Sequence, residues 1–162
     1  MLSLSALLAC LLESSISDTV PKMLSLALNC LWRLSLLVDF DKFSPTSGAL
    51  QLIKSLPNLG ELEIRVCSTR DNAEAVSKYL STPSCLDRSL NKLKRVVIHR
   101  FMGSKTEFLF IKLLLARTPS LVRMIVKPLR DFVCGECNIT TKLTSFPRAS
   151  PEAEIFYSPY QS

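Results

Sequence analysis

A short pattern of apolar residues recurs four times along the 162-residue chain and constrains its fold more than any other feature. Each copy, which we call the recurring phrase, reads apolar-x-x-apolar-x-apolar, where x is any residue. The middle residues of successive copies lie 28 (62 − 34), 34 (96 − 62) and 28 (124 − 96) positions apart, at or above the upper end of leucine-rich-repeat spacing. Such repeats bury their apolar edge against neighbours and leave one long surface free. The phrase therefore predicts a solenoid whose function lies on that surface. Its four copies are Leu31/Leu34/Leu36, Leu59/Leu62/Ile64, Leu93/Val96/Ile98 and Leu121/Met124/Val126.

Helical patterns separate the four copies. The clearest follows Ser104-Lys105-Thr106-Glu107, where serine and glutamate have capping-box spacing, and it runs to Ala116 before Pro119 ends it. We expect two further helices, at about 48–56 between Pro45 and Pro57 and at about 72–80, where Asp71 and Glu74 have the same spacing. Alternating strands and helices predict an α/β solenoid with a parallel sheet on its concave wall and helices on the outer side.

Composition narrows the class of protein. With 48% hydrophobic and 21% charged residues the chain can bury one core, and its net charge of +6 favours acidic partners. The spacing of its six cysteines resembles no disulfide scaffold, so we expect reduced thiols. The apolar residues 1–12 are too short to span a membrane and follow no basic residue, the first being Lys22. We therefore expect residues 1–12 to form a buried strand or helix and expect no membrane contact. Together with the reduced thiols, this predicts an intracellular protein, cytoplasmic or nuclear.

The residues between the apolar positions are expected on the concave face, because side chains alternate along a strand. Two of the three rows that result are mostly basic toward the C-terminal half, which favours an acidic segment of a partner protein. In the alternative interpretation, Glu61 and Glu63 only pair with Arg33, Arg65 and Arg95 across the strands. The rows are Arg33, Glu61, Arg95 and Arg123; Leu37, Arg65, His99 and Lys127; and Ser35, Glu63, Val97 and Ile125. The candidate partner-binding residues are Arg33, Glu61, Glu63, Arg65, Arg95, His99, Arg123 and Lys127.

No pattern in the sequence predicts catalysis. His99 is the only histidine, and its nearest candidate partners in sequence, Arg100 and Lys105, cannot orient an imidazole as a carboxylate does. The chain has no Gly-x-Ser-x-Gly, P-loop or Gly-x-Gly-x-x-Gly motif. We therefore expect that the protein is not an enzyme, has no catalytic residue and binds no cofactor.

The pair Cys134 and Cys137 has the Cys-x-x-Cys spacing of zinc and redox sites. A structural zinc needs four ligands, and the remaining candidates, Cys67, Cys85 and His99, form no second pair. A redox pair belongs at a helix start after a strand, and no clear helix follows here. Incidental cysteines in a terminal loop are the preferred interpretation, so no metal site is predicted.

Residues 90–108, LNKLKRVVIHRFMGSKTEF, resemble the FBD module of plant F-box/leucine-rich-repeat proteins. The match follows the family pattern LxxVxIxxFxG, then a turn, a helix with a glutamate, a proline and an LxxM strand ending at Met124. The segment Leu56-Pro57-Asn58-Leu59 is similar to the repeat that precedes this module. The resemblance covers roughly 24–128.

The resemblance implies substrate recognition within an SCF-type ubiquitin ligase, in which repeats select the target and an N-terminal F-box binds the adaptor. No F-box pattern precedes Leu31, so adaptor binding is not expected. In the family an Asn or Cys follows three positions after the last apolar residue of each repeat. Here only Cys67 fits, the equivalents being Asp39, Phe101 and Leu129, which predicts a short and irregular solenoid.

The expected organisation is degenerate leucine-rich repeats over 1–80, an FBD-like module over 81–128 and a C-terminal cap or flexible tail over 129–162. In the cap alternative, Ile155, Phe156, Tyr157 and Tyr160 fold back onto the last repeat. The predicted function is a non-catalytic protein–protein interaction module. Two alternatives stay open: a truncated gene product without independent function, and a nucleic-acid-binding protein, which the scattered basic residues and the absence of a known module disfavour.

Overall fold

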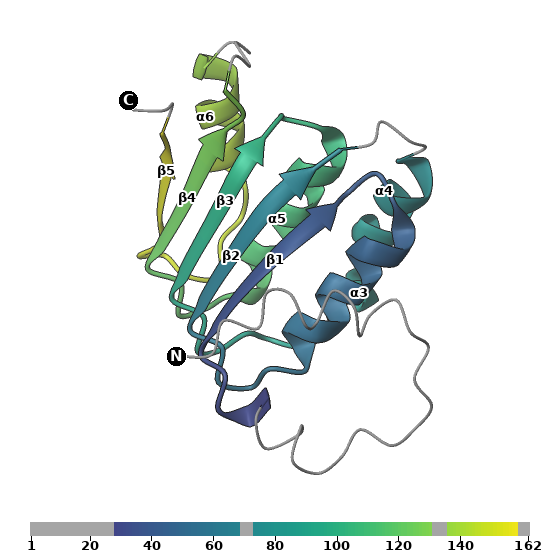
Figure 1. The fold of residues 1–162 in the computed structure, drawn as a ribbon. Coiled ribbons are helices and arrows are strands. Elements are labelled where there is room, and N and C mark those ends of the chain that lie inside the picture. Colours follow the sequence, from purple (N-terminus) through teal and green to yellow (C-terminus); the bar gives the residue numbers. More distant parts are fainter. Residues whose placement is uncertain (1–27, 69–72, 131–135, 159–162) are drawn as a thin grey trace.

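The described residues, 28–68, 73–130 and 136–158 of the computed structural model, form a five-stranded sheet with helices on one side (Figure 1). The strands follow each other across the sheet in chain order and every neighbouring pair is parallel, which confirms the predicted α/β class with a parallel sheet. They are β1 (Arg33–Asp39), β2 (Glu61–Cys67), β3 (Arg95–Phe101), β4 (Arg123–Pro128) and β5 (Glu154–Tyr157). The helices are α3 (Phe43–Lys54), α4 (Glu74–Ser81), the 3₁₀ helix η1 (Pro83–Leu86), α5 (Lys105–Arg117) and α6 (Glu136–Ser145).

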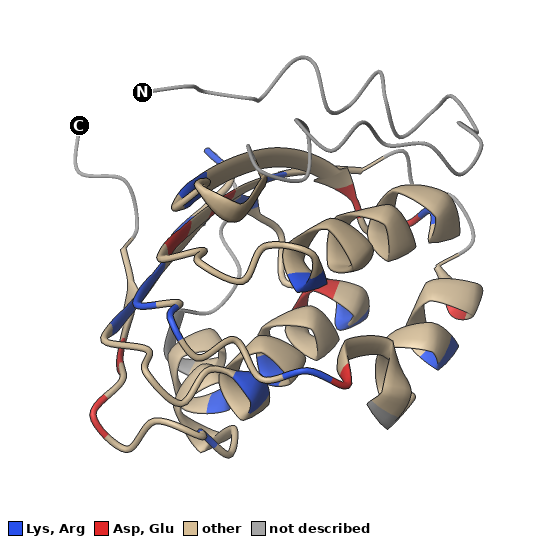
Figure 2. Cartoon of the chain, turned by 90° about the horizontal axis from the view of Figure 1, so that it is seen from below, with Lys and Arg blue, Asp and Glu red and all other residues tan. Residues whose placement is uncertain are grey.

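The strand register follows the recurring phrase. Its middle residues, Leu34, Leu62, Val96 and Met124, lie directly opposite one another on β1 to β4 and are buried. Viewed from the end where the strands begin, the helices lie together on one side of the sheet (Figure 2). No helix of the described part of the chain covers the other side. We call that surface, whose first row starts at Arg33, the open face.

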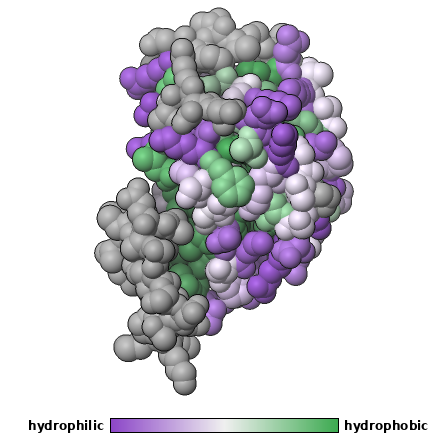
Figure 3. All heavy atoms as spheres, turned by 90° about the vertical axis from the view of Figure 1, so that its right-hand side faces the viewer, coloured by the Kyte–Doolittle hydropathy of each residue, from purple (hydrophilic) through white to green (hydrophobic). Residues whose placement is uncertain are grey.

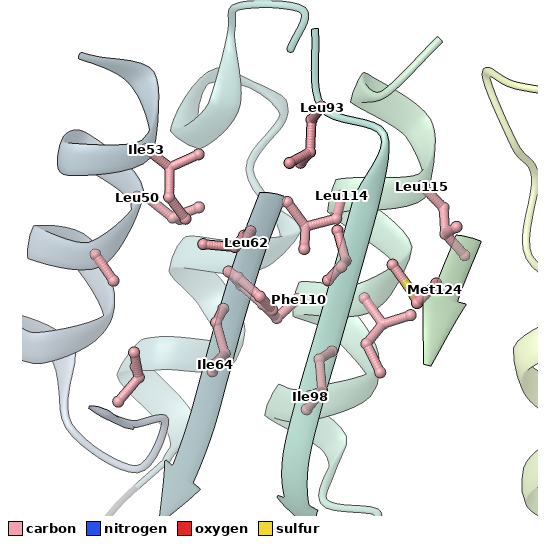
Figure 4. Close-up of a cluster of buried hydrophobic side chains, with 14 of the residues drawn as sticks. Leu50, Ile53, Leu62, Ile64, Leu93, Ile98, Phe110, Leu114, Leu115 and Met124 are labelled. Atoms are coloured by element: carbon pink, nitrogen blue, oxygen red, sulfur yellow. The ribbon is translucent and has the colours of Figure 1, made fainter. Parts of the chain in front are cut away.

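The core lies between the sheet and the helices. Leu50 and Ile53 of α3 and Phe110 and Leu114 of α5 point toward the inward side chains of β2 and β3 (Figure 4). Phe110 is 1% exposed, and its ring centroid lies 4.8 Å from that of Phe40. Because all the strands share this layer, the sheet is held by one continuous apolar core.

Helix α3 begins at Phe43, earlier than the predicted start near Gly48. Pro45, a boundary in the sequence pattern, lies in the first turn of the helix in the structure. A proline is tolerated there because the amides of the first turn have no acceptor within the helix. The predicted helix at about 72–80 is α4, and Asp71 of its predicted cap lies outside the described residues.

The capping box predicted for α5 is confirmed. The backbone amide of Glu107 donates to Ser104 Oγ at 3.2 Å, and the amide of Ser104 donates to Glu107 Oε2 at 2.6 Å. The amide of Met102 donates to the other carboxylate oxygen at 3.0 Å. Glu107 is only 2% exposed, so one buried carboxylate ties the β3–α5 loop to the helix.

Two residues near this connection have left-handed backbone, Arg100 near the end of β3 at φ 62° and Gly103 in the β3–α5 loop at φ 74°. The turn at Arg100 shifts the β3–β4 register between Ile98 and Phe101 and directs Phe101 into the core, where it is fully buried. Its ring meets that of Phe108 edge-on at 5.3 Å. The leucine-rich-repeat position expected to hold Asn or Cys is therefore occupied here by a core aromatic.

Residues after Pro128 add α6 and β5, neither of which the sequence analysis predicted as a helix or strand. Ile155 of β5 lies opposite Met124 of β4, so β5 extends the sheet by one parallel strand. The segment before β5 is fastened by Ser150 Oγ, which donates to the Leu121 carbonyl at 2.7 Å, and by Arg148, which donates to the Ala153 carbonyl at 2.7 Å. Tyr160 lies outside the described residues.

The side of the molecule on which α3 and α4 lie is largely hydrophilic, with hydrophobic groups between the polar ones (Figure 3). Phe43 of α3 is 50% exposed, and its ring packs edge-on against that of Tyr79 with the ring centroids 5.0 Å apart. Among the described helices, none has both the length and the apolar content to cross a bilayer. The apolar residues 1–12 are not among the described residues.

Candidate functional site

The eight candidate residues all lie on the open face. In the first row Arg33, Glu61, Arg95 and Arg123 are in register, and β5 adds Glu154 beside Arg123. In a second row Ser35, Glu63, Val97 and Ile125 are in register, and β5 adds Phe156. In a third row Leu37, Arg65 and His99 are in register, while Lys127 follows after the register shift of β3.

Three of these side chains form a hydrogen-bonded network across β1, β2 and β3. Glu63 Oε1 lies 2.6 Å from His99 Nε2, and Glu63 Oε2 accepts a hydrogen bond from Arg33 Nη2 at 3.2 Å. Arg33 Nε also lies 3.8 Å from a carboxylate oxygen of Glu61. The carboxylate favours the His99 tautomer with its proton on Nε2. Both oxygens of Glu63 are therefore used in cross-strand bonds.

This network corrects the sequence analysis of His99. The hydrogen-bond partner of its imidazole is Glu63, 36 residues away in the sequence, and not the sequence neighbours Arg100 or Lys105. The pairing is diagonal, because Glu63 lies directly opposite Val97 and His99 is two residues further along β3. Diagonal neighbours on one face of a sheet are within reach of long side chains. The predicted rows place Glu63 and His99 in such a diagonal position, so this pair could have been predicted from the sequence.

The Glu63 carboxyl is ionised more easily than an exposed one. Partial burial raises its pKa, but the hydrogen bonds from Arg33 and His99 and their charges outweigh burial, so the pKa lies below 4.5. An acid with a lowered pKa in the folded state stabilises the fold at pH values above its ordinary pKa. That stabilisation is lost as the pH falls through the lowered value.

We therefore expect Glu63→Gln to lower the free energy of unfolding at pH 7 by about 1 kcal/mol, because one charged acceptor of two bonds is lost. The difference from the wild-type protein should shrink as the pH is lowered below 4.5, the ordinary pKa of the carboxyl. Urea unfolding at a series of pH values measures both effects. Glu61→Gln is the matched control, since Glu61 makes only a 3.8 Å contact with Arg33. A difference that stays constant down to acid pH would contradict the assignment.

Three cations of the open face have no ion pair with any described residue: Arg65, Arg95 and Lys127. Arg65 and Arg95 are exposed, and Lys127 is half-buried. Arg95 also lies directly opposite Arg123, and like charges so placed repel each other. The predicted alternative, in which the two glutamates neutralise their arginine neighbours, thus holds for Arg33 and not for Arg65 or Arg95.

A shallow hollow of about 140 Å³ lies at the centre of the open face. It brings together residues of all three rows, including Arg95 and Lys127, and the Glu63–His99 pair forms part of its wall. Apart from Leu62, whose side chain is buried in the core, the hollow is lined by Arg33, Glu61, Glu63, Arg95, Val97, His99 and Lys127.

At its β5 edge the open face holds one exposed aromatic ring beside an ion pair. Arg123 pairs with Glu154 at 3.6 Å and lies over the ring of Phe156, with its guanidinium carbon 5.2 Å from the ring centroid. Phe156 is 44% exposed despite this contact. The sequence pattern places Phe156 in a cap or a flexible tail and does not single out Glu154. The signal was the spacing, since Ile155 follows Met124 by 31 residues (155 − 124), within the earlier steps of 28 to 34.

The described residues contain no group of three or more His, Cys, Asp or Glu side chains placed to hold a metal ion. Cys134 and the side chain of Cys137 lie outside what the structure describes, so the interpretation of that pair stays a prediction. Within the described ranges Cys30, Cys67 and Cys85 are free thiols. Burial raises the pKa of the Cys85 thiol, which suits a packing role.

Comparison of the chain with protein-family models, with curated proteins and with solved structures finds no match. The functional conclusion therefore depends on the chemistry of the open face.

Proposed function

We propose that this chain is a non-catalytic protein-interaction module whose open face binds an acidic segment of a partner protein. The observation that carries the proposal is the set of cations Arg65, Arg95 and Lys127, which have no ion pair with any described residue and lie on a sheet surface that no described helix covers. A buried or paired cation contributes little to recognition, whereas an unpaired one gains an ion pair on binding.

The charge balance of the face supports an acidic partner. Its rows hold five cations and three carboxylates, a balance of +2 (5 − 3) with His99 neutral. Charge of one sign concentrated on a surface steers oppositely charged partners and raises their association rate. The cations are Arg33, Arg65, Arg95, Arg123 and Lys127, and the carboxylates are Glu61, Glu63 and Glu154.

The finer interpretation is a short, irregular leucine-rich-repeat solenoid that ends in an FBD-like unit and selects targets as in an SCF-type ubiquitin ligase. It is supported by the recurring apolar phrase and by the resemblance of 90–126 to the FBD pattern. The parallel sheet and the one-sided helices agree with such a solenoid, because its strands share one wall. This interpretation stays a prediction, as does the intracellular location.

A peptide-display selection tests the proposal without a known partner. Random peptides selected on the wild-type protein should be enriched in Asp and Glu, and their binding should fall at least about tenfold in Arg65→Glu/Arg95→Glu, which reverses two unpaired charges. The matched control is Lys105→Glu/Lys112→Glu, which makes the same charge change at two exposed lysines of α5. The control should bind the selected peptides like the wild-type protein.

Equal loss of binding in both double variants would overturn the proposal, because net charge and not the open face would then govern binding. A selection that yields no peptide dependent on the open face would also overturn it and favour a chain without independent function. Tight binding of single-stranded or duplex nucleic acid with a steep salt dependence, unchanged in Lys105→Glu/Lys112→Glu and lost in Arg65→Glu/Arg95→Glu, would assign the face to nucleic acid.

A further inference from the structure

The hollow on the open face carries a net charge that suits one monovalent anion. Its lining holds three cations, Arg33, Arg95 and Lys127, and two carboxylates, Glu61 and Glu63, which gives +1 (3 − 2) with His99 neutral. Arg33 is already bonded to Glu63, so the cations available to a ligand are Arg95 and Lys127. One carboxylate brings the hollow to neutrality.

The same count disfavours a phosphate monoester. A phosphorylated side chain carries a charge of about −1.5 to −2 at pH 7, which exceeds the single positive charge of the hollow. The excess would face Glu61 and Glu63, whose side chains are 29% and 27% exposed and line the same hollow. The negative charges of the phosphate and of the two glutamates would repel each other inside the hollow. Because the glutamates are partly buried, solvent screens this repulsion less than bulk water would.

Apolar side chains continue from the hollow toward the edge of the sheet. Val97 lines the hollow on β3, and the same row passes through Ile125 of β4 to the exposed Phe156 of β5. Neighbouring strands are about 4.8 Å apart, so Ile125 lies one strand spacing and Phe156 two strand spacings from Val97. In an extended peptide, side chains two residues apart are separated by about 6.6 Å. This separation lies between one strand spacing, about 4.8 Å, and two strand spacings, about 9.6 Å, so when one peptide side chain lies at Val97, the side chain two residues away reaches Ile125 and Phe156.

We propose that the hollow binds the carboxylate of one Asp or Glu in an extended partner segment, with an apolar side chain two residues away packed on Ile125 and Phe156. The segment crosses the strands from β3 toward β5. This inference rests on the proposed function and specifies its ligand as a carboxylate-x-apolar motif. Specificity comes from the count of charges in the hollow and from the apolar row beside it.

Four five-residue capped peptides test the inference. The parent has alanines flanking a Glu and a Leu that are two residues apart; the others replace Glu by Gln, Glu by phosphoserine, or Leu by Gln. Dissociation constants come from backbone-amide NMR titrations at low salt. We expect shifts at Val97 and Ile125 for the parent, binding about tenfold weaker for each Gln peptide, and phosphoserine binding no tighter than the parent.

Protein variants complete the experiment. Arg95→Gln should weaken the parent peptide about tenfold, as expected for loss of one charge-assisted hydrogen bond. Phe156→Ser, at an exposed position, should weaken the parent and leave the peptide without Leu unchanged. Lys112→Gln on the exposed side of α5 is the control and should leave binding unaltered.

Tighter binding of the phosphoserine peptide than of the parent would overturn the inference, as would equal binding of all four peptides. If display-selected acidic peptides still depend on Arg65 and Arg95 in either case, the proposed function stands and only the motif is wrong. If no peptide of either kind depends on these arginines, both fail.

Discussion

Replacing Glu107 by alanine is expected to lower the free energy of unfolding by about 3 kcal/mol, as measured by urea denaturation. The carboxylate accepts hydrogen bonds from the amides of Met102 and Ser104, at 3.0 and 2.6 Å, and is 2% exposed. Alanine leaves these amides without their acceptor inside the β3–α5 loop, where each unpaired group costs about 1–3 kcal/mol. A loss below about 1 kcal/mol would contradict this role.

Glu107→Gln is the matched control, because its amide oxygen still accepts a hydrogen bond and its volume is unchanged. We expect it to be clearly more stable than Glu107→Ala. Burial raises the pKa of the Glu107 carboxyl above 4.5 even though the bonds from Met102 and Ser104 lower it. The folded state therefore retains this proton more strongly than the unfolded chain does. The stability of the wild-type protein relative to Glu107→Gln should fall as the pH rises from 4.5 through the raised pKa.

Phe110→Ala is expected to have the largest effect, a loss of about 4 kcal/mol in the free energy of unfolding. Phe110 is 1% exposed at the centre of the layer between α5 and the sheet, and its ring packs on Phe40 at 4.8 Å. Its truncation removes apolar burial and leaves a cavity that the parallel strands cannot close without moving together.

The control for this core variant is Phe156→Ala. The same chemical change at a side chain that is 44% exposed should alter stability by no more than about 1 kcal/mol. Thermal or urea unfolding of both variants gives the comparison. Similar losses at the two positions would show that Phe110 does not anchor the core.

The recurring phrase predicted most of the sheet because strand alternation depends on local sequence. Side chains alternate along every strand, so the apolar positions predicted which residues face the helices and which share the open face. The steps of 28, 34 and 28 residues predicted a register in which Leu34, Leu62, Val96 and Met124 align. The capping box at Ser104 and Glu107 was also predictable, since it depends on residues three positions apart.

The last strand was harder to predict for a physical reason. Prolines surround β5, and Ile155 and Tyr157 are only half-buried, so the apolar pattern is weak there. Its pairing with β4 depends on contacts with residues some 30 positions earlier, such as the 2.7 Å bond from Ser150 to the Leu121 carbonyl. A local sequence pattern carries no information on such distant contacts, so by itself it predicts a cap or tail for these residues.

The sequence by itself determined the fold class, the inward and outward residues of four strands and the open-face side chains of those four strands, because each depends on a short-range periodicity. Only the tertiary structure decided which of those side chains remain available. Arg33, Glu63 and His99 come from strands about 30 residues apart and are bonded to one another, whereas Arg65, Arg95 and Lys127 have no ion pair with a described carboxylate. The formation of an ion pair depends on the distance and the direction between two side chains across the folded sheet. The sequence shows which residues are charged but gives neither of these quantities.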